Sequence, residues 1–178
     1  MLAYKGFDPG LICLGYQFKR GINVTDEANC GLNGFHCAEN PLDCLTYYPN
    51  MNQSEYYLVD AVGDRDEDNI DSKISCTKLN ILTKLSKENF FLHALAYMVD
   101  HPHREWNRYV AKERVRASNG FGIVRGKEPV ACGDIGDVLA LAKEDPGTEK
   151  IRQLALATVD GDKLKPGVWY NVDFEERR

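Results

Sequence analysis

The spacing of apolar and polar positions changes along this chain of 178 residues. Up to residue 24, short apolar runs alternate with glycine, which predicts brief strands joined by tight turns: LAYKGF, LICLGYQF and GINV. Two later runs, YYLVDAV over residues 56–62 and SKISCTKLNIL over residues 72–82, are rich in β-branched and aromatic residues and predict longer strands. The acidic run GDRDEDNID between them is expected to form an exposed hairpin loop.

Three segments are predicted to be helical. Asn40 can cap a short helix that begins at Pro41, a residue that loses nothing by lacking an amide hydrogen at this position. Residues 87–99, KENFFLHALAYMV, are apolar on nearly every side, so this helix is expected to be the central core helix. Pro102 ends it, and residues 104–118, REWNRYVAKERVRAS, predict a second helix that is mostly polar.

These elements predict an α+β fold, with an N-terminal mixed sheet packed on one long core helix. A polar helix and a smaller β-rich C-terminal lobe follow, because glycine and β-branched residues dominate after Asn119. The expected organisation is an α+β domain over residues 1–100, a basic helical connector over residues 101–118 and the β-rich lobe over residues 119–178.

Composition places the chain among soluble globular proteins, at 43% hydrophobic and 28% charged residues. No window approaches the roughly 20 apolar residues that cross a bilayer, and the start does not resemble a signal peptide. We therefore expect a cytoplasmic protein, with no membrane association, whose six cysteines are thiols. The net charge of −5 is uneven, because residues 101–130 hold seven basic against three acidic side chains while both flanking regions are acidic.

Two metal sites can be considered from spacing alone. Cys30, His36, Cys37 and Cys44 lie close together, but they lack the paired short spacing of structural zinc sites, and buried thiols are the expected alternative. The carboxylates of Asp64, Asp66 and Asp68 have the opening spacing of a calcium loop. The glycine and glutamate that such a loop needs further on are replaced by Asn69 and Ser75, so we expect a solvated acidic loop and no bound metal.

Charged surfaces are the remaining candidates for a binding site. On a helix over residues 104–116, basic side chains at steps of four would form one cationic ridge, with Trp106 and Tyr109 available for stacking, and nucleic acid could contact it. A solvated helix face explains the same residues. The acidic run could likewise meet a basic partner. The candidate partner-binding residues are Arg104, Trp106, Arg108, Tyr109, Lys112, Arg116, Asp64, Asp66, Glu67 and Asp68.

Catalytic motifs are missing from the sequence. There is no nucleophile elbow, zinc-protease motif, phosphate-binding glycine loop or dinucleotide-binding fingerprint, which argues against hydrolases, metalloproteases and NTPases. His93 lies within an apolar segment and is expected to be a core residue. No catalytic residue and no cofactor are therefore expected.

The runs YKGF, LICLGYQF, CGLNGFHCAENPLDCLTYY and DSKISCTKLNI resemble an uncharacterised domain of bacteriophage and prophage proteins, over roughly residues 1–98. The later run ASNGFGIVRGKEPVACGDIGDVLALA is similar to the tails of such proteins, in which repeats build a stacked β segment. This resemblance implies a phage or prophage accessory protein.

A second resemblance concerns the layout of the first half. Tyr4, Lys5 and Gly6, followed by Gly34, His36 and an apolar helix that ends in two tyrosines, resemble the strand, turn and helix of ADP-ribosyltransferases. In those enzymes such elements hold NAD. Lys5 stands where they have histidine or arginine, and no glutamate on a late strand matches theirs.

Two functions from different classes follow. The first is a phage accessory protein whose charged surfaces bind and inhibit a bacterial defence complex, as anti-CRISPR proteins do with an effector nuclease. The second is an NAD-using transferase, or an inactive relative of one, with Tyr4, Lys5 and His36 around the Gly34 turn. The expected partner of the first is a bacterial defence protein or nuclease complex, and a homodimer is compatible with both.

Overall fold

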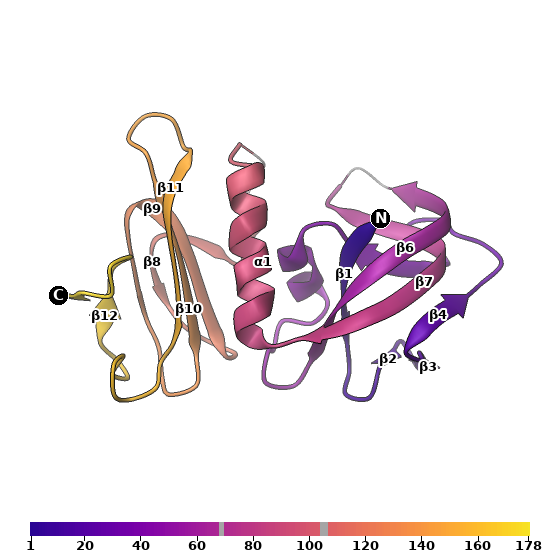
Figure 1. Ribbon diagram of the computed structural model, residues 1–178, viewed down its shortest axis with the longest axis horizontal. Helices are drawn as coiled ribbons and strands as arrows, with labels where there is room; N and C mark the ends of the chain where they lie inside the picture. Colours follow the sequence, from indigo (N-terminus) through magenta and orange to yellow (C-terminus); the bar gives the residue numbers. More distant parts are fainter. Residues whose placement is uncertain (68–69, 104–106) are drawn as a thin grey trace. The chain divides into compact units, whose positions relative to one another are not determined.

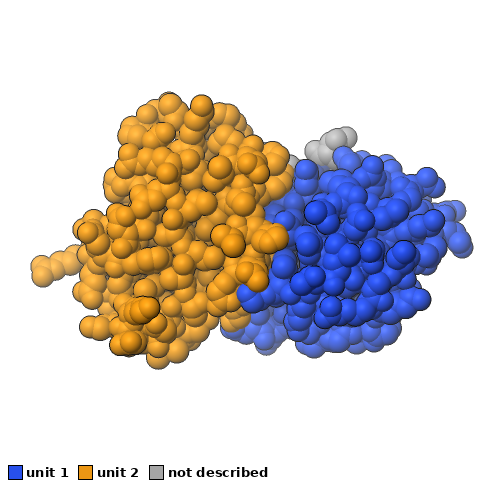
Figure 2. Space-filling model, viewed as in Figure 1, with its two compact units in different colours: residues 1–86 blue, residues 87–178 orange. Residues whose placement is uncertain are grey.

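Strands form about half of the chain in the computed structural model, which describes residues 1–67, 70–103 and 107–178 (Figure 1). The residues divide into unit 1, Met1–Ser86, and unit 2, Lys87–Arg178 (Figure 2). The α+β prediction is wrong, because among the described residues only α1 (Lys87–Asp100) and the 3-10 helix η1 (Pro41–Thr46) are helical. The protein is mostly β.

Unit 1 is built around a ring of hydrogen-bonded strands. Strands β1 (Leu2–Phe7), β5 (Phe35–Ala38), β6 (Glu55–Glu67) and β7 (Lys73–Leu85) pair in the order β1, β5, β7, β6 and back to β1. Strand β4 (Gly21–Val24) adds to β7, and β2 (Ile12–Cys13) forms a hairpin with β3 (Tyr16–Gln17). All pairings within this sheet are antiparallel, as expected for short strands joined by tight turns.

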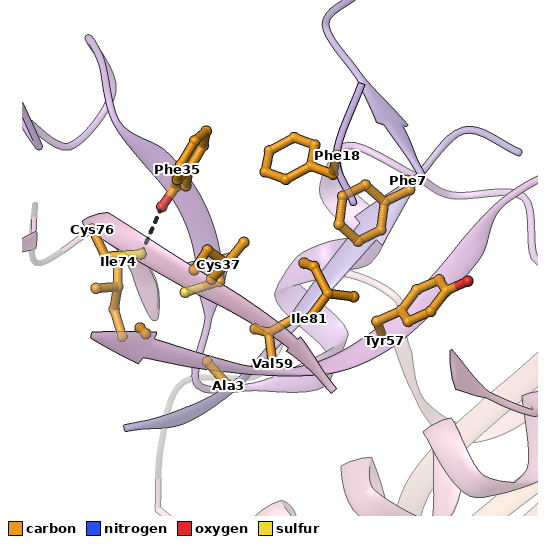
Figure 3. Packing of buried hydrophobic residues seen from close by; sticks show 12 residues of the cluster. Ala3, Phe7, Phe18, Phe35, Cys37, Tyr57, Val59, Ile74, Cys76 and Ile81 are labelled. Atoms are coloured by element: carbon orange, nitrogen blue, oxygen red, sulfur yellow. Dashed lines mark hydrogen bonds between the residues drawn. The ribbon is translucent and has the colours of Figure 1, made fainter. Parts of the chain in front are cut away.

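The side chains that point into this ring form the first core. Aromatic rings pack edge to face there, with the Phe7 and Phe18 centroids 5.2 Å apart and the Phe7 and Tyr57 centroids 5.6 Å apart (Figure 3). The buried cluster comprises Ala3, Phe7, Phe18, Phe35, Cys37, Tyr57, Val59, Ala61, Ile74, Cys76, Leu79 and Ile81. Asn40 caps η1 as predicted, because its side chain accepts a hydrogen bond from the backbone N–H of Leu42.

Unit 2 contains three parallel strands that stack in register. Strand β8 (Val110–Arg116) pairs with β9 (Phe121–Cys132), and β9 pairs with β10 (Val138–Glu144), so that Val110, Ile123 and Ala140 form one row. The connections between these strands are only a few residues long, whereas parallel strands usually need a long crossover. Here β8 bends at Glu113, which has a left-handed φ of 63°, and successive turns of the chain stack as in a short solenoid.

Three further strands and one helix complete unit 2. Strand β11 (Ile151–Thr158) pairs with β10, β12 (Trp169–Tyr170) pairs with β9, and β13 (Glu176–Arg177) pairs with β12, all antiparallel. Helix α1 packs on β10 and β11, and its Phe91 ring lies 5.0 Å from the Phe121 ring of β9.

Two helix predictions are corrected by this arrangement. The helix over residues 87–99 exists, as α1, but it belongs to unit 2, where it packs on β10 and β11, because an apolar helix face does not specify its partner. The polar helix over residues 104–118 is wrong where the structure describes it, since Val110–Arg116 is strand β8. Backbone pairing with β9 outweighs the helical propensity of its lysine and arginine residues.

Candidate functional site

The acidic residues predicted from sequence lie at the end of the long β6–β7 hairpin. Asp64, Asp66 and Glu67 are all exposed, and we call these three residues the acidic edge. They belong to strand β6 and not to a loop, which corrects the hairpin-loop prediction for this part of the run. Asp68, the fourth predicted acidic residue, lies outside the described residues.

Local contacts hold the acidic edge in place. Gly63 has a φ of 77°, and a Cβ there would lie 2.4 Å from the Thr77 hydroxyl, so the backbone bulge before Asp64 requires glycine. The backbone N–H of Asp64 donates to that hydroxyl at 3.0 Å. One carboxylate oxygen of Asp66 accepts the backbone N–H of Cys30 at 2.8 Å, which fixes the preceding loop against the hairpin. The carboxylates of Asp64 and Glu67 are therefore displayed on an ordered scaffold.

Within the described residues 107–116, strand β8 stands where the helical ridge of basic side chains was predicted. Arg104 and Trp106 lie outside the described residues, and the strand geometry of β8 removes the step of four on which the ridge depended. Arg108 and Lys112 are exposed, and the Arg108 guanidinium lies 5.1 Å from the centre of the Tyr109 ring and donates to its hydroxyl. The helical spacing of four residues on which the prediction rested is therefore absent from the described part of this segment.

A different set of basic side chains is brought together on unit 2. Val115 packs against the buried cluster of unit 2 around Leu139 and Leu141, which we call the second core, so its neighbours Arg114 and Arg116 point to the outer face of the sheet. The Arg114 guanidinium lies 3.7 Å from the centre of the Trp169 ring, and Trp169 pairs directly with Arg177. We call Arg114, Arg116, Trp169 and Arg177 the cationic face.

Acidic neighbours offset part of the charge of the cationic face. Arg116 lies 3.7 Å from an oxygen of Asp134, and Arg177 lies 2.9 Å from an oxygen of Glu175.

Arg114, Trp169 and Arg177 were not predicted as site residues. The alternation of Arg114 and Arg116 about Val115 was the sequence signal for a strand that could have revealed the first of them.

The lysine of the transferase-like prediction points into the core of unit 1. Lys5 lies on the same face of β1 as Ala3 and Phe7 and is only 5% exposed, and its ammonium donates to the backbone carbonyl of His36 at 2.7 Å. The ammonium also lies 5.2 Å from the centre of the Phe18 ring. Lys5 is therefore engaged by backbone and aromatic rings, in a position that favours a structural role.

The rest of the transferase-like group lies around this core. The Nε2 atom of His36 accepts the backbone N–H of Gly31 at 2.9 Å, so this imidazole fixes the turn ahead of β5. Tyr4 is half-buried, and burial raises the pKa of its hydroxyl.

The cysteines near this core are thiols. None of the six cysteines is in a disulfide, and no group of three metal-binding side chains occurs within residues 1–67, 70–103 and 107–178. A hydrogen bond between the Cys37 and Cys76 thiols raises the pKa of Cys37 and lowers the pKa of Cys76, so Cys37 is the one that keeps its proton more strongly. Burial raises the pKa of Cys44 to about 12.

These observations define a β-rich protein of two units in which the acidic edge and the cationic face lie on strands. Comparison with known families shows that the chain belongs to the family of the domain of unknown function DUF7666, whose sequence model matches residues 1–93. No curated protein and no solved structure matches the chain. None of the helices described has both the length and the apolar composition needed to span a bilayer.

Proposed function

We propose that this protein is a phage or prophage accessory factor that works by binding, and that it inhibits a bacterial defence complex such as a CRISPR effector nuclease in the cytoplasm of the host. The observation that carries the proposal is the acidic edge, in which Asp64 and Glu67 are exposed at the end of a two-stranded hairpin. A nuclease binds DNA through a basic groove, and an ordered acidic surface is electrostatically complementary to such a groove.

Rigid display of the carboxylates supports binding by this surface. The strand pairing of β6 with β7, the Gly63 bulge and the bond from Cys30 to Asp66 all fix the backbone before binding. Because little conformational entropy is then lost on association, more of the electrostatic attraction is retained as affinity. The phage origin rests on the resemblance of the first 98 residues to phage and prophage domains.

A charge-reversal experiment tests this function. The chain would be used to capture its partner from a bacterial host lysate, alongside the double variant Asp64→Lys/Glu67→Lys, which leaves Asp66 and its bond to Cys30 intact. We expect the variant to lose the nuclease complex and its inhibition of DNA cleavage. The matched control, Asp162→Lys/Glu176→Lys, reverses two exposed charges in unit 2 and should retain both. Equal capture by both variants would contradict the proposal.

The transferase-like alternative has a direct test as well. An NAD-using enzyme would transfer label from NAD to a host protein, and the transfer would stop in Lys5→Ala. The contacts of the Lys5 ammonium with the His36 carbonyl and the Phe18 ring favour the binding function over this alternative. We therefore expect no transfer with the unmodified chain.

A further inference from the structure

Strand β4 is an open edge of the sheet in unit 1. It pairs with β7 on one side, and no described strand pairs with its other side. Figure 1 shows β4 at the margin of its unit, beyond β7. An open edge presents unpaired N–H and C=O groups that can add another strand.

The register with β7 identifies which backbone groups face outward. The backbone N–H of Thr25 donates to the carbonyl of Thr77 at 2.9 Å, so Thr25, Asn23 and Gly21 direct their backbone groups toward β7. By alternation, the N–H and C=O groups of Ile22 and Val24 face the open side. The Asn23 side chain is buried and donates to the carbonyl oxygens of Lys19, Gly21 and Leu79, which fixes this short strand to β7 and to the turn before it.

The side chains of Ile22 and Val24 are unusually exposed for apolar residues on a strand edge. Their exposed fractions are 57% and 59%, and both point to the same face, opposite to Asn23. The edge strand β8 of unit 2 provides a contrast, since it carries Lys112, Arg114 and Arg116 and a bulge at Glu113, which are devices that discourage strand addition. Strand β4 itself has no charge and no bulge.

The residues that flank β4 are self-complementary in charge. The segment reads KRGINVTDE over residues 19–27, with Lys19 and Arg20 before the strand and Asp26 and Glu27 after it, all four exposed. Gly21 has a φ of 84°, and the Lys19 backbone and the Asn23 side chain exchange hydrogen bonds, so the basic flank turns away from the line of the strand. Antiparallel pairing of two copies about Asn23 would place Ile22 opposite Val24 and bring the basic start of each strand near the acidic end of the other.

Backbone parity allows the register about Asn23. Ile22 and Val24 both direct their N–H and C=O groups outward, so a pairing of Ile22 with Val24 of the second copy forms a hydrogen-bonded pair. The neighbouring registers allowed by parity are centred on Ile22 or Val24. Because β4 extends only over Gly21–Val24, these registers pair only Ile22 with Ile22 or only Val24 with Val24, whereas the register about Asn23 pairs both outward-facing residues of each copy.

We propose that two copies of this chain associate through β4, antiparallel and two-fold symmetric about Asn23, so that the sheets of two unit 1 rings join edge to edge. The contact is isologous, since each copy supplies the same segment. It buries a four-residue apolar cluster from Ile22 and Val24 of both copies, between two clusters of opposite charges. The interface is small, so we expect a dimer that dissociates on dilution. The acidic edge takes no part in it, and dimer formation can therefore be tested apart from the proposed function.

Sedimentation velocity of the full chain across a concentration series tests the backbone contact. Val24→Pro removes an outward N–H without removing a bond to β7, and proline is tolerated at such positions on edge strands. Its matched control is Val24→Thr, which keeps that N–H and the β-branched shape. We expect wild-type chain and Val24→Thr to dimerise and Val24→Pro to remain a monomer with an unchanged circular dichroism spectrum.

A charge exchange tests the register. Lys19→Glu puts an acidic side chain at the start of β4, near Asp26 and Glu27 of the second copy, at both ends of the symmetric dimer, and should weaken association roughly tenfold. Adding Glu27→Lys to that variant restores opposite charges and should restore association. A wild-type chain that stays monomeric, a dimer that survives Val24→Pro, or a double variant as weak as Lys19→Glu would each overturn the proposal.

Discussion

At the scale of single residues, Arg125 shows that a basic residue counted from sequence need not contribute to a surface. Its side chain is buried, its Nε donates to Glu144 at 2.5 Å, and one terminal nitrogen donates to the carbonyl oxygens of Pro102 and Glu149. A buried guanidinium is tolerated only with such partners. Arg125 is therefore an internal connection between β9, β10 and two loops of unit 2, and it adds nothing to a cationic surface.

The Arg125–Glu144 pair gives a stability prediction. Glu144→Gln leaves a buried positive charge without its counter-charge and should lower the free energy of unfolding by about 3–5 kcal/mol. Glu128→Gln is a matched control, because Glu128 pairs with Lys143 while largely exposed, and it should leave the denaturation midpoint nearly unchanged. Urea denaturation of both variants measures the difference. Similar midpoints would mean that Arg125 is adequately held by backbone carbonyls alone.

The thiol of Cys44 gives a prediction about pH. Burial raises its pKa from 9.0 to about 12, so in the folded chain it stays protonated where an unfolded chain would ionise. The stabilisation that comes from keeping this thiol protonated is complete below pH 9. As the pH rises from 9 toward 12 the free energy of unfolding falls by about 1.4 kcal/mol per pH unit. The destabilisation caused by Cys44→Ala should therefore shrink over this range.

Denaturant titrations between pH 7 and 11 would measure this trend. Leu45→Ala is the control, because it removes a fully buried neighbour in η1 that does not titrate. The loss of free energy of unfolding caused by Leu45→Ala should stay constant with pH, whereas the loss caused by Cys44→Ala should shrink. Parallel curves for the two variants would contradict the assigned pKa of Cys44.

At the scale of elements, the turn before β5 depends on one glycine. Gly34 has a φ of 84°, and a Cβ there would lie 2.2 Å from the Ser75 hydroxyl and 2.9 Å from the Cα of Ala28. The Ser75 hydroxyl in turn donates to the carbonyl of Asn33 at 2.6 Å. The NGFHC segment is thus a packed junction between a turn and the β5–β7 pair.

Two glycine substitutions separate packing from backbone strain. Gly15→Ala has a similar φ of 78° but nothing within 4 Å of the added Cβ, so it should cost about 1–2 kcal/mol. Gly34→Ala adds a steric clash to the same backbone penalty, so it should lower the free energy of unfolding by about 2–5 kcal/mol in total. Thermal denaturation compares the two. An equal loss would mean that Ser75 moves aside at little cost.

Elements whose signals are local could be predicted from the sequence. The two long strands, the Asn40 cap with Pro41, and the helix that became α1 follow from β-branched content, capping chemistry and apolar periodicity. Strand β8 has one weak local signal, the alternation of Arg114 and Arg116 about Val115, but its lysines and arginines suit an exposed helix equally well, and the pairing with β9 decides for the strand. The cationic face was missed for the same reason, since Arg114 and Trp169 meet only through tertiary pairing.

At the scale of the whole molecule, α1 belongs to unit 2, although the sequence predicts it as the core helix of the N-terminal domain. Its buried residues Phe90, Phe91, Ala94, Leu95 and Met98 cover one face of the second sheet, so the division of the chain falls between Ser86 and Lys87. The family match ends at residue 93, within α1. Neither a family boundary nor an apolar pattern reveals which sheet a helix covers, because the burial of its face is favourable on either one.

Two pairs of fragments test this assignment. Cutting between Ser86 and Lys87 keeps α1 with the sheet that it covers, and residues 87–178 should give a cooperative thermal transition. Cutting after Asp100 removes the cover over Phe121, β10 and β11, and residues 101–178 should lose that transition and bind a hydrophobic dye, since an uncovered apolar sheet face is unstable in water. Residues 1–86 should fold in the same way with or without the helix appended. If residues 101–178 unfolded as cooperatively as residues 87–178, α1 would not be an essential part of the second core.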